Sequence, residues 1–361
     1  EPYRRQRQMC IRDRLLLLSM CILGACEKEK SHTVLELFSE SQSLSQKKDF
    51  YVNEDSIAII EGLSCDGKNL IVNDYHSGCC YTLFDKKSGE YIARFGTIGQ
   101  GPAELPSPCY GYLTKSGFTV FDDQTRIVMK YSLDSLRNSR KKDGSPVRLA
   151  QYKIPEAQIS RLIAIDDTTF LCTGTYKSRY QYLLFNKNDS VLDYGVDVYN
   201  AADSAFQTYT RYLSNQGNLV MNPEKHTFAG SINFSSNMDF FEIVNNKIEL
   251  IKSLRLGDPI NKPVNEEGIY YVDLTENTQT GYIDLSATSK YVYALYSDKK
   301  MYENNRRSNT VLVFDWEGNP IKKYSLDTDA YYIAVDGTQQ SLFAAVKNSS
   351  SGWKIVCYTL D

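Results

Sequence analysis

Six short runs rich in β-branched and aromatic residues recur along the chain, and their spacing constrains the fold more than any other feature. Their successive starts lie 49, 51, 58, 65 and 50 residues apart, at Lys68, Gly117, Thr168, His226, Tyr291 and Ser341. Each run follows a polar turn and precedes another strand-like run, and helical periodicity is nearly absent. A spacing near fifty residues is typical of a four-stranded antiparallel unit with variable loops. The sequence therefore predicts an all-β, six-bladed β-propeller.

Four of these units continue into a pair of strands whose connecting turn contains Asp, Asn or Gly. These hairpins are residues 81–95, 182–195, 240–254 and 311–326. Asp, Asn and Gly tolerate the left-handed backbone of tight turns, so the unit is an up-and-down meander. The last unit has only three strands before Asp361. Because an open array exposes its edge strands, we expect the apolar patch Val34–Phe38 to supply the missing strand and close the ring.

The N-terminal part of the chain predicts export and lipidation. The apolar run from Leu15 ends in Leu23-Gly24-Ala25-Cys26 and is too short to span a bilayer as a helix. We interpret residues 15–25 as a truncated lipoprotein signal peptide, Cys26 as the lipidated residue, 26–50 as a tether with the closing strand, and 51–361 as the propeller. Residues 1–14 are expected to be an artefact, because Met9 to Arg14 back-translates to a sequencing-adapter sequence.

One loop gives the chain a family resemblance. Phe95 to Pro108 contains Gly99-Gln100-Gly101-Pro102-Ala103-Glu104, which follows the first unit. Together with the lipobox, this G-x-G-P-x-E joint resembles the TolB-like six-bladed β-propeller lipoproteins of Gram-negative gut anaerobes. The resemblance implies an outer-membrane lipoprotein on the cell surface or the periplasmic face. Gly99, Gly101, Pro102 and Glu104 carry the motif, and we interpret the stretch as a linker between units, since no Lys-Ser/Thr follows as in a phosphate loop.

Charge and residue usage exclude several functions. A net charge of −3 leaves no basic footprint for nucleic acid. The three His residues show no metal-ligand spacing, so we predict neither a metal nor a cofactor. The cysteines lie in or near predicted strands, and their spacing leaves disulfide pairing open.

Aromatic and basic residues gather in the predicted connections between the second and third strands of the units. All these connections lie on one rim of a propeller, so their side chains are expected to surround one mouth. Rings stack on sugar or peptide faces, and Arg binds carboxylates. The candidate ligand-binding residues are Tyr75, His76, Tyr176, Arg179, Tyr180, Phe234, Tyr302, Arg306, Arg307 and Trp353.

The function expected from these features is binding, with a glycan, a peptide or an envelope protein held at the loop-bearing mouth. No catalytic residue is assigned. Two other classes stay open: a lyase or lactonase-type enzyme that uses the channel, and a structural subunit that docks on an outer-membrane transporter. A cluster of His or carboxylates at the channel would favour the enzyme, and an apolar ring-shaped rim would favour docking.

Overall fold

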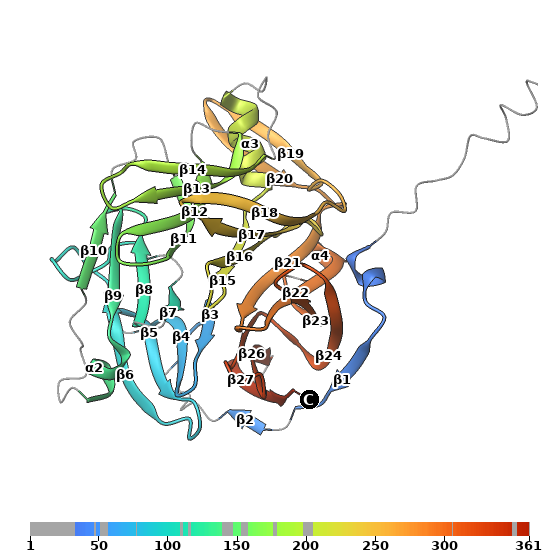
Figure 1. The fold of residues 1–361 in the computed structure, drawn as a ribbon. Coiled ribbons are helices and arrows are strands. Elements are labelled where there is room, and N and C mark those ends of the chain that lie inside the picture. The colour runs from blue at the N-terminus through green and yellow to red at the C-terminus, as the bar shows by residue number, and fades with distance from the viewer. Residues whose placement is uncertain are drawn as a thin grey trace, which may run out of the picture. The chain divides into compact units, whose positions relative to one another are not determined.

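A computed structural model describes most of the chain from Thr33 onward. The described residues are 33–46, 48–50, 57–76, 78–108, 111–114, 117–138, 147–152, 158–175, 179–197, 205–304, 306–348 and 352–360. The signal-like run, Cys26 and residues 1–14 lie outside them. Between Val34 and the C-terminus, six antiparallel sheets stand side by side around a ring (Figure 1). This arrangement confirms the predicted six-bladed β-propeller.

The first three blades are complete four-stranded meanders. Blade 1 contains β3 (Gly62–Cys65), β4 (Asn69–His76), β5 (Cys79–Asp85) and β6 (Tyr91–Thr97). Blade 2 contains β7 (Tyr112–Thr114), β8 (Gly117–Asp122), β9 (Ile127–Tyr131) and β10 (Val147–Gln151). Blade 3 contains β11 (Gln158–Ala164), β12 (Thr169–Thr175), β13 (Tyr180–Asn186) and β14 (Val191–Asp197).

The other three blades follow the same plan. Blade 4 contains β15 (Gly217–Met221), β16 (Thr227–Ile232), β17 (Met238–Val244) and β18 (Lys247–Leu254). Blade 5 contains β21 (Gln279–Ala287), β22 (Tyr291–Lys300), β23 (Ser308–Asp315) and β24 (Pro320–Ala330). Blade 6 takes β25 (Tyr332–Val335), β26 (Ser341–Asn348) and β27 (Gly352–Thr359) from the C-terminal end of the chain.

The core consists of apolar layers between blades. Among the described residues, each of the six junctions between neighbouring blades holds its own buried cluster. The second strand of each blade contributes to the layers on both of its faces, as Ile71 does toward blade 2 and Leu70 toward blade 6. Strands buried on both faces are continuously apolar rather than alternating. This is why the six second strands were recognisable from their sequences.

The N-terminal segment closes the ring, but with different residues from those expected. Val34–Leu37 forms a short 3-10 helix rather than a strand. The fourth strand of blade 6 is β2 (Lys48–Phe50), which pairs with β27 through Lys48 and Cys357. A further strand, β1 (Ser41–Leu44), runs parallel to β24 and makes blade 5 five-stranded. The prediction of an N-terminal closing strand is therefore confirmed, and its placement at Val34–Phe38 is wrong.

Val34 and Phe38 act as packing residues instead. Both are buried between blades 4 and 5, and the ring of Phe38 packs edge-on against Phe314 with centroids 5.1 Å apart. Apolar spacing alone does not distinguish a strand from a single helical turn of four residues.

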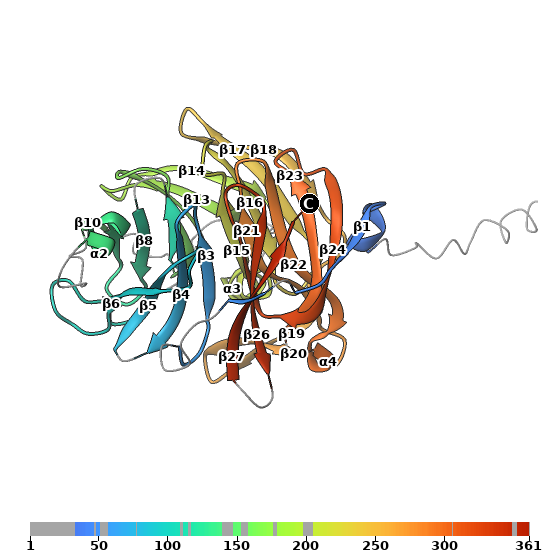
Figure 2. The ribbon, with the colours of Figure 1, turned by 90° about the horizontal axis from the view of Figure 1, so that it is seen from below.

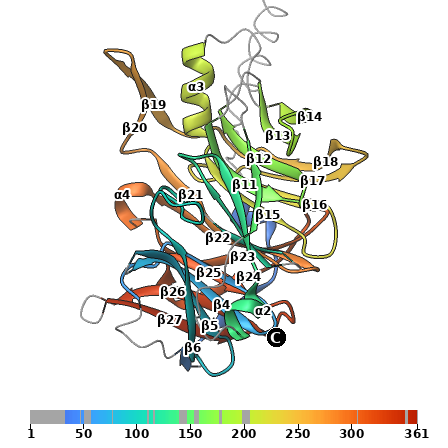
Figure 3. The ribbon, with the colours of Figure 1, turned by 90° about the vertical axis from the view of Figure 1, so that its left-hand side faces the viewer.

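Four elements stand outside the blades. They are α2 (Leu133–Asn138), α3 (Ala205–Ser214), the hairpin of β19 (Asn261–Glu266) with β20 (Ile269–Leu274), and α4 (Met301–Asn304). Figure 3 shows α3 beside the hairpin, which projects from the ring between blades 4 and 5. The hydroxyl of Tyr302 in α4 donates to the carbonyl oxygen of Leu274 at 3.2 Å. The sequence patterns predicted none of these elements.

A buried charge cluster joins blades 3 and 4. Asp239 on β17 is 1% exposed, accepts a hydrogen bond from the Tyr182 hydroxyl at 3.2 Å, and lies 2.6 Å from Nη2 of Arg255. A Cβ atom at Gly230 would lie 2.0 Å from the Tyr182 hydroxyl oxygen, so glycine is needed there for the tyrosine to reach across. The hydrogen bond between the blades therefore depends on Tyr182 from blade 3 and on Gly230 and Asp239 from blade 4.

Candidate functional site

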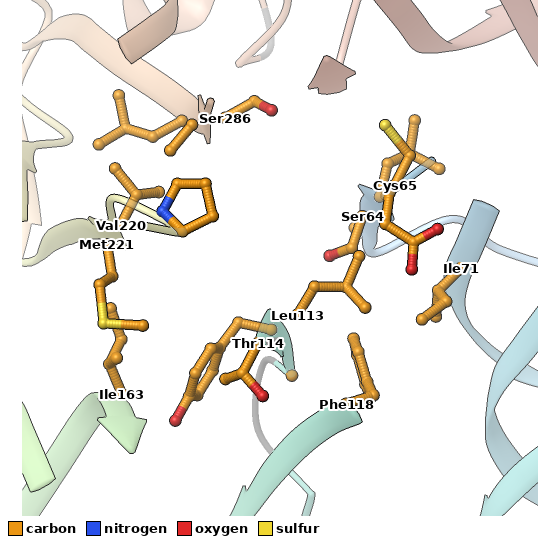
Figure 4. Close-up of a pocket in the computed structure, with 18 of the residues that line it drawn as sticks. Ser64, Cys65, Ile71, Leu113, Thr114, Phe118, Ile163, Val220, Met221 and Ser286 are labelled. Atoms are coloured by element: carbon orange, nitrogen blue, oxygen red, sulfur yellow. The ribbon is translucent and has the colours of Figure 1, made fainter. Parts of the chain in front are cut away.

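The first strands of the blades line a central channel that holds a cavity. These strands contact their neighbours around the ring, as β15 does with β21 and β21 does with β25. Figure 2 shows β15 beside β21. The cavity measures about 410 Å³ and is lined by five of the six first strands, β3, β7, β11, β15 and β21, with Gly337 from blade 6 (Figure 4). Its volume lies within the roughly 300–1,000 Å³ of small-molecule sites.

The cavity reaches one rim of the ring. Asp66, Gly67, Pro223 and Gly337 line it, and each lies in a turn between the first and second strands of a blade. We call this end the turn rim. The connections between second and third strands lie at the opposite end, which we call the loop rim, because the strands of a meander alternate in direction.

Polar and apolar lining residues lie at different depths. Each first strand runs from the loop rim to the turn rim, so Arg161 lies deeper than Ile163, and Asn218 lies deeper than Val220 and Met221. Asp284 likewise precedes Ser286 and Ala287 on β21, and Asn73 pairs with Gly62 at the deep end of β3. Figure 4 shows Ile163, Val220 and Met221 across the cavity from Ile71 and Cys65. The deep end of the cavity, its floor, is thus polar, and near the turn rim apolar residues such as Ile163, Val220 and Met221 lie beside the polar residues Ser64, Asp66, Thr114 and Ser286.

Asp284 is a titratable group on this floor, and its surroundings change its pKa. Burial raises its pKa to about 7, although backbone N–H groups and the charge of Arg161 act in the opposite direction. Its Oδ2 accepts the N–H of Ile333 at 2.8 Å, and Ser286 Oγ accepts the N–H of Val335 at 2.9 Å. Both side chains therefore also satisfy backbone groups of β25, the neighbouring first strand.

Asn73 lies beside the floor with its amide oxygen buried. Its side chain is 8% exposed, and its Oδ1 has no hydrogen-bond partner within the described part of the chain. A buried amide oxygen without a partner is costly, so such groups point to a ligand or a water molecule.

Of the ten residues predicted as a mouth, Tyr176 lies outside the described residues, and the other nine belong to the loop rim. Tyr75 and His76 end β4, and their side chains also lie outside the described part. The other seven are described, and none of them lines the cavity: Arg179, Tyr180, Phe234, Tyr302, Arg306, Arg307 and Trp353. The predicted mouth and the cavity are therefore at opposite ends of the channel.

Two of these loop-rim residues, Arg179 and Trp353, contact neighbouring side chains. Arg179 forms an ion pair with Asp197 at 2.9 Å and lies over the ring of Tyr180. The ring of Trp353 packs edge-on against Tyr331 with centroids 5.0 Å apart.

The remaining loop-rim residues differ in exposure and conformation. Arg307 pairs with Asp329 at 3.3 Å, and Tyr302 is 71% exposed. Phe234 is half-buried in the turn between β16 and β17, and Arg306 is exposed with a φ of 56°. These residues are partly or fully exposed, and none of the seven described ones lines the channel cavity.

The G-x-G-P-x-E stretch is the linker that the sequence predicted. It joins β6 to β7, and Oε2 of Glu104 accepts the N–H of Gly101 at 2.8 Å. A Cβ atom at Gly99 would lie 2.1 Å from that oxygen, which explains the glycine. Pro102 offers its carbonyl oxygen to Arg148 at 3.4 Å. The motif thus sets the shape of a loop between blades 1 and 2.

The described part of the chain holds free cysteines and no cluster of metal-binding side chains. There, no three His, Cys, Asp or Glu side chains gather as a metal site. The five described cysteines are free, namely Cys65, Cys79, Cys80, Cys172 and Cys357. The described helices also include none that is long and apolar enough to cross a membrane.

Comparison with known sequences decides the family. The profile described as TolB-like 6-blade propeller-like matches residues 40–338. The chain belongs to this family. The TolB-like assignment agrees with the six blades and with the loop motif, which lies inside the matched range. Among curated proteins there is no significant match for this TolB-like chain.

Solved structures resemble this TolB-like propeller in fold. A protein of Bacteroides fragilis described as exported is 12% identical, with a TM-score of 0.49 over 91% of this chain and 96% of that chain. A member of the DUF4221 family from Bacteroides vulgatus is 11% identical, with a TM-score of 0.48 over 88% and 97%. A gluconolactonase of Xanthomonas campestris is 12% identical, with a TM-score of 0.44 over 86% and 88%. TM-scores below 0.5 at such identities do not carry an activity from one protein to another.

The channel residues of the TolB-like propeller were missed because their strands give weak signals. Gly62–Cys65 and Tyr112–Thr114 are four and three residues long, and neither is continuously apolar. The position of these strands along the chain does give a usable signal. Each first strand ends just before a polar turn, and that turn precedes a recognisable second strand. Counting back from those turns would have placed Arg161 and Asp284 near the channel.

Proposed function

We propose that this TolB-like propeller is an exported, membrane-anchored binding protein that holds a small ligand in its central channel. The cavity on the turn rim carries the proposal, because it combines a volume suited to a small molecule with apolar lining residues and a few polar groups. The loop rim, where the sequence placed the ligand, is the competing position.

The anchor in this proposal is a lipid on Cys26. It is supported by Leu23-Gly24-Ala25-Cys26, with small residues before the Cys and charged residues after it. Lipidation adds about 0.8 kcal/mol of membrane affinity per buried methylene, so several chains hold a protein stably on a membrane. The proposed location is the outer membrane, on the cell surface or the periplasmic face.

Metabolic labelling tests the anchor. Cells that express the chain with an intact export signal and receive a labelled fatty acid are expected to yield labelled, membrane-bound protein, and Cys26→Ala is expected to yield none. Cys21→Ala serves as the matched control and should label like the wild type, since Met20 precedes Cys21. Equal labelling of Cys26→Ala and the wild type would contradict the assignment.

Two glycines allow the channel site to be tested without disturbing the fold. Gly67 and Gly337 line the cavity at the turn rim, and a Cβ atom built on either has no neighbour within 4 Å. Neither has a positive φ. Gly67→Trp and Gly337→Trp therefore add bulk at the mouth of the cavity from positions where the first side-chain atom meets no neighbour. The matched control is the double variant Arg306→Ala, Trp353→Ala on the loop rim.

Saturation-transfer NMR with a defined panel of monosaccharides, amino acids, nucleosides and short carboxylic acids is the test. At least one compound is expected to bind the wild type and the loop-rim variant, and to lose binding in both Trp variants. Binding that survives the Trp variants but not the loop-rim variant would place the ligand on the loop rim. Failure of the whole panel to bind would refute a small-molecule channel site.

A further inference from the structure

Two further hollows on the turn rim adjoin the channel cavity. We propose that the ligand is a short extended peptide, with one side chain in the cavity and its flanking residues in these two hollows. This inference rests on the proposed function, in which the cavity is a ligand site. It is carried by lining residues that the three spaces share and by charged side chains in the outer two.

The first of them, the α2 hollow, lies beside blades 1 and 2. It measures about 390 Å³, and its lining includes the turn at residues 66–69 and residues 132–134 at the beginning of α2. Asp66, Gly67 and Thr114 line both this hollow and the channel cavity. The two spaces therefore adjoin at the mouth of the cavity.

The second, the blade 4 hollow, lies beside blades 3 and 4. It measures about 550 Å³, and its lining includes the turns at residues 165–168 and 221–226. Thr114, Met221 and Pro223 line both this hollow and the channel cavity. Together the three spaces exceed the roughly 1,000 Å³ at the upper end of small-molecule sites, so a ligand that occupies all of them is an extended chain.

Each outer hollow holds a lysine and an acidic side chain that are open to a ligand. Lys68 and Asp134 line the α2 hollow, and Glu224 and Lys225 line the blade 4 hollow. All four are exposed, and within the described residues their side chains form no hydrogen bond or ion pair. A peptide can carry ammonium and carboxylate groups on one chain, whereas a neutral glycan carries neither and a polyanion would meet a carboxylate in each hollow.

The lining of the outer hollows also distinguishes a peptide from a glycan. Sugar rings stack on aromatic side chains, and among the described residues no Phe, Trp or Tyr lines either outer hollow. Most of their lining residues instead carry hydroxyl, amide or ionisable groups, including Ser132, Thr168 and His226. Such groups suit the N–H and C=O groups of a peptide backbone and its polar side chains.

The channel cavity suits a single anchoring side chain. Ile163, Val220 and Met221 give it apolar surface, and polar residues lie beside them near the turn rim (Figure 4). Among these, the Ser286 hydroxyl accepts the N–H of Val335 and keeps its own hydrogen for a carbonyl oxygen. An apolar side chain can therefore be buried while the backbone of the same peptide meets polar partners, as with the anchor residues of other interfaces.

Isothermal titration calorimetry with capped peptides tests the inference. The parent series has leucine at the centre, lysine and glutamate at the two ends in either order, and one to three serines between the centre and each end. We expect at least one member to bind, a central glycine to weaken it at least about tenfold, and serine at both ends to weaken it at least about threefold. N-acetyl-leucinamide, which has the anchoring side chain alone, should bind at least about tenfold more weakly than that member.

Charge reversal in the outer hollows gives a readout that a loss of stability would not produce. Asp134→Lys and Glu224→Lys should each shift the preference between peptides with two lysine ends and peptides with two glutamate ends at least about threefold toward glutamate. Glu317→Lys is the matched control, because Glu317 is exposed on the turn between β23 and β24 at the same rim and lines none of the three spaces. It should leave the preference unchanged, and melting curves establish that each variant is folded.

The outcomes separate this inference from the proposed function. If no peptide binds more tightly than N-acetyl-leucinamide, while some compound binds in a manner blocked by Gly337→Trp, the channel site stands and the peptide assignment is wrong. If Asp134→Lys and Glu224→Lys keep the wild-type preference, the outer hollows do not hold the ligand and the inference fails as well. If only maltohexaose or chitohexaose binds, the ligand is a glycan and not a peptide. If nothing binds at about 10 mM, both proposals fall.

Discussion

A chain that starts at residue 51 is expected to lose most of the stability of the ring. It lacks the 3-10 helix, β1 and β2, and with them four buried side chains, Val34, Phe38, Leu44 and Phe50. Truncating one buried aliphatic or aromatic side chain costs about 2–5 kcal/mol, and whole domains have only about 5–15 kcal/mol of net stability. We expect a fall of at least about 10 °C in Tm, or no cooperative transition, in differential scanning calorimetry.

A chain that starts at Thr33 is the matched control. It removes residues 1–32 and keeps every strand, so its Tm should equal that of the longer chain. A second variant, Phe50→Ala, tests closure without deletion, because the Phe50 ring packs edge-on against Phe343 with centroids 5.4 Å apart. We expect it to cost about 3–5 kcal/mol. A chain from residue 51 that melts like the control would show that the ring does not need its N-terminal strand.

The second large effect is expected at Asp239. Asp239→Ala leaves Arg255 and the Tyr182 hydroxyl without their shared acceptor between blades 3 and 4. The Arg255 side chain is 35% exposed and can be solvated when its partner is lost, so the cost comes mainly from the Tyr182 and Ser253 hydroxyls that lose their acceptor. We expect Asp239→Ala to lower the free energy of unfolding by about 1–3 kcal/mol. Urea unfolding followed by circular dichroism measures this loss directly.

The control for Asp239 is an exposed pair in the same region. Nζ of Lys247 lies 3.2 Å from Asp193, and the lysine side chain is 62% exposed. Exposed pairs contribute about 0–1 kcal/mol, so Lys247→Ala should change the unfolding free energy by less than about 1 kcal/mol. A similarly small effect of Asp239→Ala would mean that the cluster contributes little to the contact between the blades.

The sequence predicted those parts of the fold that depend on apolar runs. The second strands are buried on both faces, so apolar and polar residues do not alternate along them. Their apolar runs could therefore be found at a regular spacing in the sequence. The third and fourth strands were recognised through their Asp-, Asn- and Gly-containing turns. Six blades, antiparallel sheets and closure by an N-terminal strand all follow from these two signals.

The strands that the sequence did not reveal are polar or very short. β1 is Ser-Gln-Ser-Leu and β2 is Lys-Asp-Phe, so neither shows alternation over a useful length. Both form because a neighbouring strand already offers unpaired backbone groups, which is a tertiary cause. Val34–Phe38 has the apolar pattern but not the partner, since Lys48–Phe50 occupies the edge of β27 and Ser41–Leu44 occupies the edge of β24.

The candidate site was harder to predict than the fold. Tyr and Arg in the loops suit ligand binding by their chemistry. The position of a cavity, however, depends on the space that the strands leave between them. The channel floor is built from an Asn, an Arg and an Asp in three separate blades, at positions 73, 161 and 284. Such a combination requires the register of every first strand, which sequence spacing does not supply.

Pairing between β2 and β27 also dictates when the molecule can finish folding. Lys48 must meet Cys357, its partner near the other end of the chain. Contacts of this separation require loop closure over nearly the whole polypeptide, and they form late. During synthesis the N-terminal strand emerges first and has nothing to pair with until the last blade arrives. A chain that stops before its last three strands would therefore leave the ring open and expose the apolar faces of blades 1 and 5 that pack on blade 6.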